Sequence, residues 1–145
     1  MAVVELAIPA RQAYLSLVRL VVDASVGALA PGLGSARLDD LKLAVSEACS
    51  NAIEAHELAP SPSSSSDPAV IRCELDHNRV TVEVADHGGG FDPNGVAHLP
   101  AATDPGRLDH ESGLGIPLMR TLADNLAFVP DRDGTTVRLT VYRAE

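Results

Sequence analysis

A carboxylate and a carboxamide lie four residues apart in an amphipathic stretch of this chain. Glu47 and Asn51 occupy positions i and i+4, which are neighbours on one face of a helix. An asparagine amide oxygen can ligate Mg²⁺, a cation that accepts oxygen ligands. A glutamate at this place can take a proton from a hydroxyl that attacks a phosphate. An ordinary solvated helix face also contains such pairs, so the pair is informative only together with other residues.

A second candidate is the acid that follows an alternating stretch. Residues 80–84 alternate valines with polar residues, and Asp86 continues the parity of the valines, which predicts that it lies on the buried face of a strand. A buried carboxylate is costly unless a donor satisfies it, and the exocyclic amine of adenine is a suitable donor. Gly88 and Gly90 follow, and glycines let a backbone approach a ring closely. The alternative is an acid that caps a glycine-rich turn.

A second glycine cluster opens a helix-like run. Gly113, Leu114 and Gly115 precede a helix that we expect to begin near Gly115 or Ile116. Free N–H groups and the positive end of the helix dipole suit a phosphate there. The spacing differs from that of a P-loop, and a plain glycine-rich helix start is the alternative.

Thr135 is the last candidate, because it shares the parity of the apolar residues in 137–141. The pattern predicts that its hydroxyl faces inward, where it needs a partner. A water or a bound base would supply one, and a local backbone group is the alternative.

The elements that must position these residues follow from periodicity. We expect an α/β sandwich in which a mostly antiparallel sheet has helices packed on one face. Helices are predicted where apolar residues recur at helical period and strands where they alternate. Proline-rich and glycine-rich stretches at 60–68 and 87–112 are predicted to be loops. The predicted helices are 11–30, 38–56 and a third ending near 124, with Pro117 in its first turn, and the predicted strands are 3–8, 71–75, 80–84, 126–129 and 135–142.

Composition limits the classes of function. With 145 residues, the chain is expected to be one domain, residues 1–145. The formal net charge of −9 and the 3% aromatic content disfavour nucleic-acid binding and anionic membranes. Cys49 and Cys73 lie in apolar segments without metal-ligand spacing and are expected to be buried thiols. We see neither a signal peptide nor an apolar run of membrane-spanning length, and expect a cytoplasmic protein.

Together, these motifs resemble the GHKL ATPases. Residues 46–53 (Ser-Glu-Ala-Cys-Ser-Asn-Ala-Ile) resemble the N box of that superfamily, and 86–90 (Asp-His-Gly-Gly-Gly) resemble its first glycine box. Residues 112–116 resemble the second glycine box, and Gly134 with Thr135 resembles the closing Gly-Thr strand. Within the superfamily, the short chain, its opening segment 6–11 and the run 113–124 resemble the bacterial anti-sigma-factor serine kinases.

The resemblance implies a Bergerat, or histidine-kinase-like ATPase, fold that binds Mg·ATP. It implies a protein-serine kinase that phosphorylates an anti-anti-sigma factor and reversibly captures a sigma factor, often as a homodimer. Residues 92–112 would form the ATP lid. By position, Glu47 would be the catalytic base, Asn51 the Mg²⁺ ligand and Asp86 the adenine recogniser; Gly88, Gly90 and Thr135 would line the base pocket, and Gly113, Leu114 and Gly115 would contact phosphates.

Two positions depart from the family pattern and keep two alternatives open. Ala55 stands where the subfamily commonly has a histidine, and Glu111 lies where a basic residue often precedes the second glycine box. His56 is next to Ala55, but on a regular helix it points roughly 140° away from Asn51. One alternative is a nucleotide-binding switch without catalysis. The other is a detached histidine-kinase catalytic domain that acts in trans.

Overall fold

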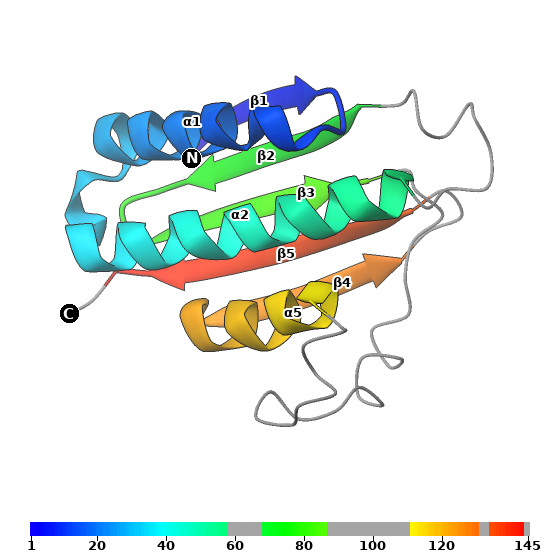
Figure 1. Cartoon of the computed structure of the whole chain (residues 1–145). Coiled ribbons are helices and arrows are strands. Elements are labelled where there is room, and N and C mark those ends of the chain that lie inside the picture. The colour runs from blue at the N-terminus through cyan, green and yellow to red at the C-terminus, as the bar shows by residue number, and fades with distance from the viewer. Residues whose placement is uncertain (58–67, 87–110, 131–133, 144–145) are drawn as a thin grey trace.

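Five antiparallel strands form one sheet in the computed structural model, which describes residues 1–57, 68–86, 111–130 and 134–143. Each neighbouring pair is antiparallel, and the strand order is β1-β2-β3-β5-β4 (Figure 1). The two predicted hairpins are confirmed as β2–β3 and β4–β5. The strands are β1 (Ala2–Ile8), β2 (Ala69–Leu75), β3 (Arg79–Ala85), β4 (Asn125–Pro130) and β5 (Thr135–Tyr142).

Within the described residues, three α-helices cover one face of this sheet. Helix α1 (Leu15–Leu29) lies over β1 and β2, α2 (Ser35–Glu57) crosses the middle of the sheet, and α5 (Glu111–Leu122) lies over β4 (Figure 1). Short 3₁₀ turns at Gln12–Tyr14 and Pro31–Leu33 precede the first two helices. The predicted α/β sandwich, with an antiparallel sheet and helices on one face, is therefore confirmed.

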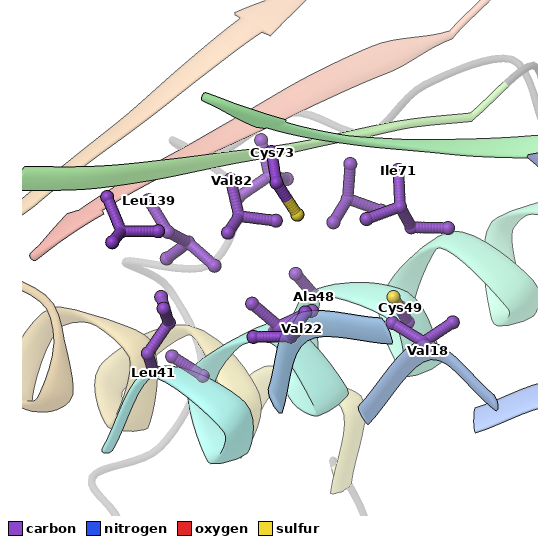
Figure 2. Close-up of a cluster of buried hydrophobic side chains, with 14 of the residues drawn as sticks. Val18, Val22, Leu41, Ala48, Cys49, Ile71, Cys73, Val82 and Leu139 are labelled. Atoms are coloured by element: carbon purple, nitrogen blue, oxygen red, sulfur yellow. The ribbon is translucent and has the colours of Figure 1, made fainter. Parts of the chain in front are cut away.

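The core lies between the helices and the sheet. Alternate residues of β2 point toward the helices, as do those of β3 and β5, and they meet apolar side chains of α1 and α2 (Figure 2). Leu41, Val45 and Ala48 of α2 are fully buried, and each large side chain buried in this way contributes roughly 1.5–3 kcal/mol. Cys49 and Cys73 are each 1% exposed, as predicted for structural thiols.

Polar cross-strand pairs cover the opposite face of the sheet. Arg138 of β5 forms an ion pair with Glu83 of β3 at 2.9 Å, and the hydroxyl groups of Thr81 and Thr140 lie 3.2 Å apart. Such pairs stabilise a sheet modestly and keep its open face compatible with water. The two faces explain the strict alternation that made the strands recognisable in the sequence.

The boundaries of the three predicted helices differ from the structure. Helix α1 begins at Leu15 rather than residue 11, because residues 12–14 form a 3₁₀ turn. Helix α2 begins at Ser35 rather than Leu38, and α5 begins at Glu111 rather than near Gly115. Pro117 therefore lies inside α5 and not in its first turn. Burial of Ile116 and Met119, which are 5% and 0% exposed, offsets the helix-breaking tendency of glycine and proline. The predicted loop and lid segments lie largely outside the described residues.

The prediction that no apolar run reaches membrane-spanning length is wrong for helix α1. Residues Gln12–Leu29 have a mean hydropathy of 1.3, and by length and composition alone they could cross a membrane. In this fold the same stretch supplies Val18 and Val22 to the core. Two of its charged residues contact α2, with Arg19 at 3.4 Å from Ser46 and Asp23 at 3.2 Å from Lys42. One face of α1 therefore packs on the rest of the domain, and 22% of the stretch is buried.

Candidate active site

Glu47 and Asn51 lie on the half-buried side of α2. Both side chains are partly exposed, whereas Ala48 and Ala52, on the opposite side, are 0% and 3% exposed. The helix is continuous from Ser35 to Glu57, so its regular geometry places the two Cβ atoms roughly 6 Å apart. The predicted juxtaposition is therefore present. Partial exposure leaves both oxygen-bearing groups accessible to a ligand.

Asp86 follows directly after β3 and is buried. Its side chain belongs to a residue only 3% exposed, as the strand parity predicted. The Asp86 N–H donates a hydrogen bond of 3.0 Å to the carbonyl oxygen of Thr135, so the ladder between β3 and β5 extends one step beyond Ala85 and Thr136. Thr135 is 1% exposed, which confirms that it faces inward. The acid and the threonine are thus held side by side.

Gly134 approaches Asp86 more closely than any other residue type could. A Cβ atom placed on Gly134 would overlap the carbonyl oxygen of Asp86 and lie 2.6 Å from its carbonyl carbon and 2.9 Å from Oδ1. Gly134 is a site residue that the motif pattern alone did not predict. The signal for it in the sequence is a glycine placed directly before a buried strand.

The second glycine cluster lies within the first turns of α5. Helix α5 begins at Glu111, so Gly113 is the last residue of its first turn whose N–H has no intrahelical acceptor. The N–H groups of Leu114 and Gly115 are used by the ordinary i to i−4 bonds of the helix. The prediction that both glycines precede the helix is wrong. Gly113 retains the free N–H group that suits a phosphate.

These residues converge at one end of the molecule. Figure 1 shows that α2 and β3 end, and β5 and α5 begin, at the same side of the sheet. Glu47 and Asn51 come from the second half of α2, Asp86 from the end of β3, and Thr135 from the start of β5. Gly88 and Gly90 lie outside the described residues, as does most of the predicted lid. Four described elements therefore bring together the acids, the amide and the free N–H groups.

His56 does not join this group. It is 2% exposed, and its burial agrees with the prediction that it points away from Asn51 toward the apolar side of α2. Ala55 is half-buried and offers no polar group. Helix α2 stays regular through this segment, so no distortion brings the imidazole toward Asn51.

The oxygen-bearing side chains of the candidate site suit Mg²⁺, a hard cation that proteins hold with few ligands of their own. Among the described residues, no group of three or more His, Cys, Asp or Glu side chains is arranged to hold a metal. Mg²⁺ in phosphoryl-transfer sites keeps several waters and relies on one or two protein oxygens together with substrate phosphates. The amide oxygen of the partly exposed Asn51 could supply such a ligand.

The chain is similar to a known ATPase family over nearly its whole length. The family model described as the histidine kinase-like ATPase domain matches residues 8–141. A serine-protein kinase RsbW of Bacillus thuringiensis (strain Al Hakam) is 31% identical over 142 residues, which are 96% of this chain and 84% of that protein. The RsbW of Bacillus pumilus (strain SAFR-032) is 34% identical, over 96% of this chain and 85% of its own length.

A solved structure shares the fold. The RsbU and RsbW domains of Rv1364c from Mycobacterium tuberculosis superpose with a TM-score of 0.67 at 18% identity, over 97% of this chain and 32% of that longer chain. The motif order, the antiparallel sheet with helices on one face, and these similarities agree. The chain belongs to the histidine kinase-like ATPase domain family and, within it, to the anti-sigma-factor serine kinases.

Proposed function

We propose that this protein is an ATP-dependent protein-serine kinase and anti-sigma factor that phosphorylates an anti-anti-sigma factor. One observation carries the proposal: the buried Asp86 follows the end of β3, at the side of the sheet where α2 ends, and Glu47 lies at the middle of α2 with Asn51 nearer that end (Figure 1). A buried acid and a half-open pair of oxygen-bearing side chains in this order suit a ligand with a purine at one end and phosphates at the other. The RsbW relatives are named serine-protein kinases.

Base recognition is assigned to Asp86. Its carboxylate accepts a hydrogen bond from the exocyclic amine of adenine, a donor that purines with a 6-carbonyl group lack. Thr135, Gly88 and Gly90 line the same pocket in this proposal. The pocket therefore selects adenine by hydrogen bonding, because aromatic residues for stacking are scarce in this chain.

Phosphate binding is assigned to the start of α5. The free N–H group of Gly113 and the positive end of the helix dipole stabilise the phosphates, and Leu114 and Gly115 lie beside them, where Gly115 allows the phosphates to approach the helix closely. Asn51 would hold Mg²⁺, which would supply positive charge to the phosphates. Glu47 orients the acceptor serine hydroxyl and accepts its proton as the serine oxygen bonds to the γ-phosphorus and the bond from that phosphorus to the bridging oxygen breaks, releasing ADP.

The partners follow from the same family. We propose that the protein binds a sigma factor and an anti-anti-sigma factor in the cytoplasm, and that it does not bind nucleic acid directly. The net charge of −9 supports the last point, because a DNA-binding surface must be basic. Transcription is then regulated through protein contacts.

We also propose a homodimer. Leu17 and Leu20 on the outer helix α1 are 40% and 63% exposed, and β1, the neighbouring edge strand, pairs only with β2 among the described strands. A free strand edge beside exposed leucines is a surface that a second copy can cover. Sedimentation should show a dimer that Leu20→Glu dissociates, and a monomeric wild type would contradict this proposal.

The kinase assignment is tested with purified protein, Mg·ATP and the cognate anti-anti-sigma factor. We expect calorimetry to show ATP binding and mass spectrometry to find an acid-stable phosphoserine on the partner. ATP binding without transfer would identify a non-catalytic switch instead. An acid-labile phosphohistidine would identify a histidine-kinase domain acting in trans, and absence of ATP binding would overturn all three functions.

A further inference from the structure

The start of β5 holds the main chain of Asp86 at two adjacent points. Thr135 accepts the hydrogen bond from the Asp86 N–H at 3.0 Å. One residue earlier, Gly134 lies against the Asp86 carbonyl group so closely that its missing Cβ would overlap the carbonyl oxygen. Asp86, Gly134 and Thr135 are all buried. Asp86 is therefore located by a hydrogen bond and by a steric contact at the same place.

The glycine at position 134 is required by space and not by its own backbone angles. Among the described residues, the one glycine with positive φ is Gly34, at +89°. Gly134 adopts a conformation open to residues with side chains, yet a Cβ there would come within 2.6 Å of the Asp86 carbonyl carbon and 2.9 Å of Oδ1. Because backbone and a buried side chain surround the position, a substituent can be accommodated only if Asp86 moves.

We infer that Gly134 is a positioning residue that sets the base specificity of the site through Asp86. The inference rests on the proposed function, because it presupposes that Asp86 reads adenine. A methyl group at position 134 pushes the Asp86 carbonyl and carboxylate away from β5. To clear the overlap, the Asp86 carbonyl must move by roughly an ångström or more, which misaligns a buried hydrogen bond, whose strength falls steeply with poor geometry. The variant should therefore lose its preference for ATP over other purine nucleotides, while the contacts to the phosphates stay unchanged.

Inosine triphosphate is the probe that isolates this effect. It differs from ATP at the purine 6-position, where a carbonyl oxygen replaces the amine, and at N1, which carries a hydrogen, and it retains the same triphosphate. A carboxylate that accepts from the amine should favour ATP by roughly tenfold or more. Titration calorimetry of Mg·ATP and Mg·ITP binding then reports the ratio of the two dissociation constants, which a uniform loss of folded protein does not change.

The decisive comparison is Gly134→Ala against Gly27→Ala. Gly27 is exposed on α1, and a Cβ there meets no atom within 4 Å, so the control variant should retain the wild-type ratio. For Gly134→Ala we expect the ATP affinity to fall to nearly that for ITP while the ITP affinity stays within roughly threefold, because ITP does not use the amine contact. A folded Gly134→Ala protein that keeps the wild-type ratio overturns the inference.

A second variant applies if Gly134→Ala does not fold. Asp86→Glu leaves position 134 unchanged and moves the carboxylate by one methylene. Loss of ATP selection supports the requirement for precise placement, whereas full selection overturns it. Failure of the proposed function gives a different result: the wild-type protein would then bind neither nucleotide, or bind both equally.

Discussion

Arg37, near the start of α2, donates a hydrogen bond of 2.6 Å from Nη2 to Oδ2 of Asp124, in the connection between α5 and β4. The same carboxylate oxygen accepts the backbone N–H of Tyr142 at 2.7 Å, and the Asp124 N–H donates to Thr140 at 2.9 Å. One aspartate thus connects the start of α2, the end of α5 and the end of β5. This connection lies at the end of the fold opposite the candidate active site (Figure 1).

Removal of this connection should destabilise the protein without changing nucleotide binding. The Arg37 and Asp124 side chains are 26% and 39% exposed, so solvent weakens their attraction. We expect Arg37→Ala to cost about 0.5–1 kcal/mol and Asp124→Ala, which also removes the acceptor of the Tyr142 N–H, about 1–2 kcal/mol. Urea denaturation of the two variants and their double mutant measures these values and the coupling between the residues.

Arg72→Ala is the matched control for the Arg37 and Asp124 variants and their double mutant. Arg72 forms an ion pair with Glu74 at 2.8 Å on the open face of the sheet, and its loss should cost less than about 0.5 kcal/mol. Additive effects of the Arg37 and Asp124 substitutions would contradict a direct interaction. A change in ATP affinity would contradict the separation of this connection from the active site.

Strand parity made the central part of the site predictable. The alternation of 80–84 extends to Asp86, and that of 137–141 extends back to Thr135, so both were expected to face inward and both do. Helical spacing likewise placed Glu47 beside Asn51 and turned His56 toward the core. These predictions succeeded because each depends on a local period within one regular element.

Features that depend on contacts between elements were not predictable in the same way. The close approach of Gly134 to Asp86 joins the start of one strand to the end of another, and no local period encodes it. The early start of α5 was missed because Gly113, Gly115 and Pro117 signal a helix boundary, whereas burial of Met119 against the core stabilises the helix despite them. Tertiary packing determined the structure at both places.

The two buried thiols should make stability fall at high pH. Burial raises the pKa of Cys49 to about 12, with a smaller contribution from the nearby Cys73, and burial raises the pKa of Cys73 to about 11. In the unfolded chain both thiols would ionise near the ordinary thiol pKa of 9.0. The unfolded state therefore binds fewer protons than the folded state above that pH. The stabilisation is complete below pH 9 and is lost as the pH rises toward 11–12.

A Cys49→Ala/Cys73→Ala variant tests this dependence. Loss of buried sulfur should cost roughly 1 kcal/mol at each site near neutral pH. Because the variant has no thiols to ionise, the difference in unfolding free energy from wild type should shrink above pH 9. Urea titrations in a reducing buffer at neutral and alkaline pH measure the difference, and parallel pH curves for the two proteins would disprove the prediction.

Asp76 should stabilise the β2–β3 turn in its ionised form. Its Oδ1 accepts the backbone N–H groups of Asn78 at 2.8 Å and Arg79 at 2.9 Å. These bonds lower its pKa below the usual 3.8. Because the pKa is lower in the folded protein, the ionised carboxylate stabilises the fold at pH values above the pKa of the unfolded chain. This stabilisation is lost as the pH falls through the lower pKa of the folded protein.

The variant Asp76→Ala should therefore unfold at lower urea concentration than wild type at neutral pH. The difference in unfolding free energy between the two proteins should decrease as the pH falls below 3.8, because the wild-type carboxylate is then progressively protonated. Asp76→Asn, which keeps an oxygen acceptor for the turn, should lose less stability at neutral pH than the alanine variant. If the difference in unfolding free energy stays constant at acid pH, ionisation of Asp76 does not contribute to the stability of the protein.

Glu47→Gln should separate catalysis from nucleotide binding. The substitution preserves the size and polarity of a half-buried side chain on α2 but removes the proton acceptor. Loss of a general base typically costs roughly 10²–10⁴-fold in rate, so phosphorylation of the anti-anti-sigma factor should fall by that factor. The affinity for Mg·ATP should stay within roughly threefold, because Asp86 and α5 make the principal nucleotide contacts in the proposed site.

Asp39→Asn is the matched control, since Asp39 lies on the same helix with a side chain that is 76% exposed, and it should retain the wild-type rate. Single-turnover assays with each variant measure transfer apart from binding, and a Glu47→Gln rate within tenfold of wild type would exclude Glu47 as the base.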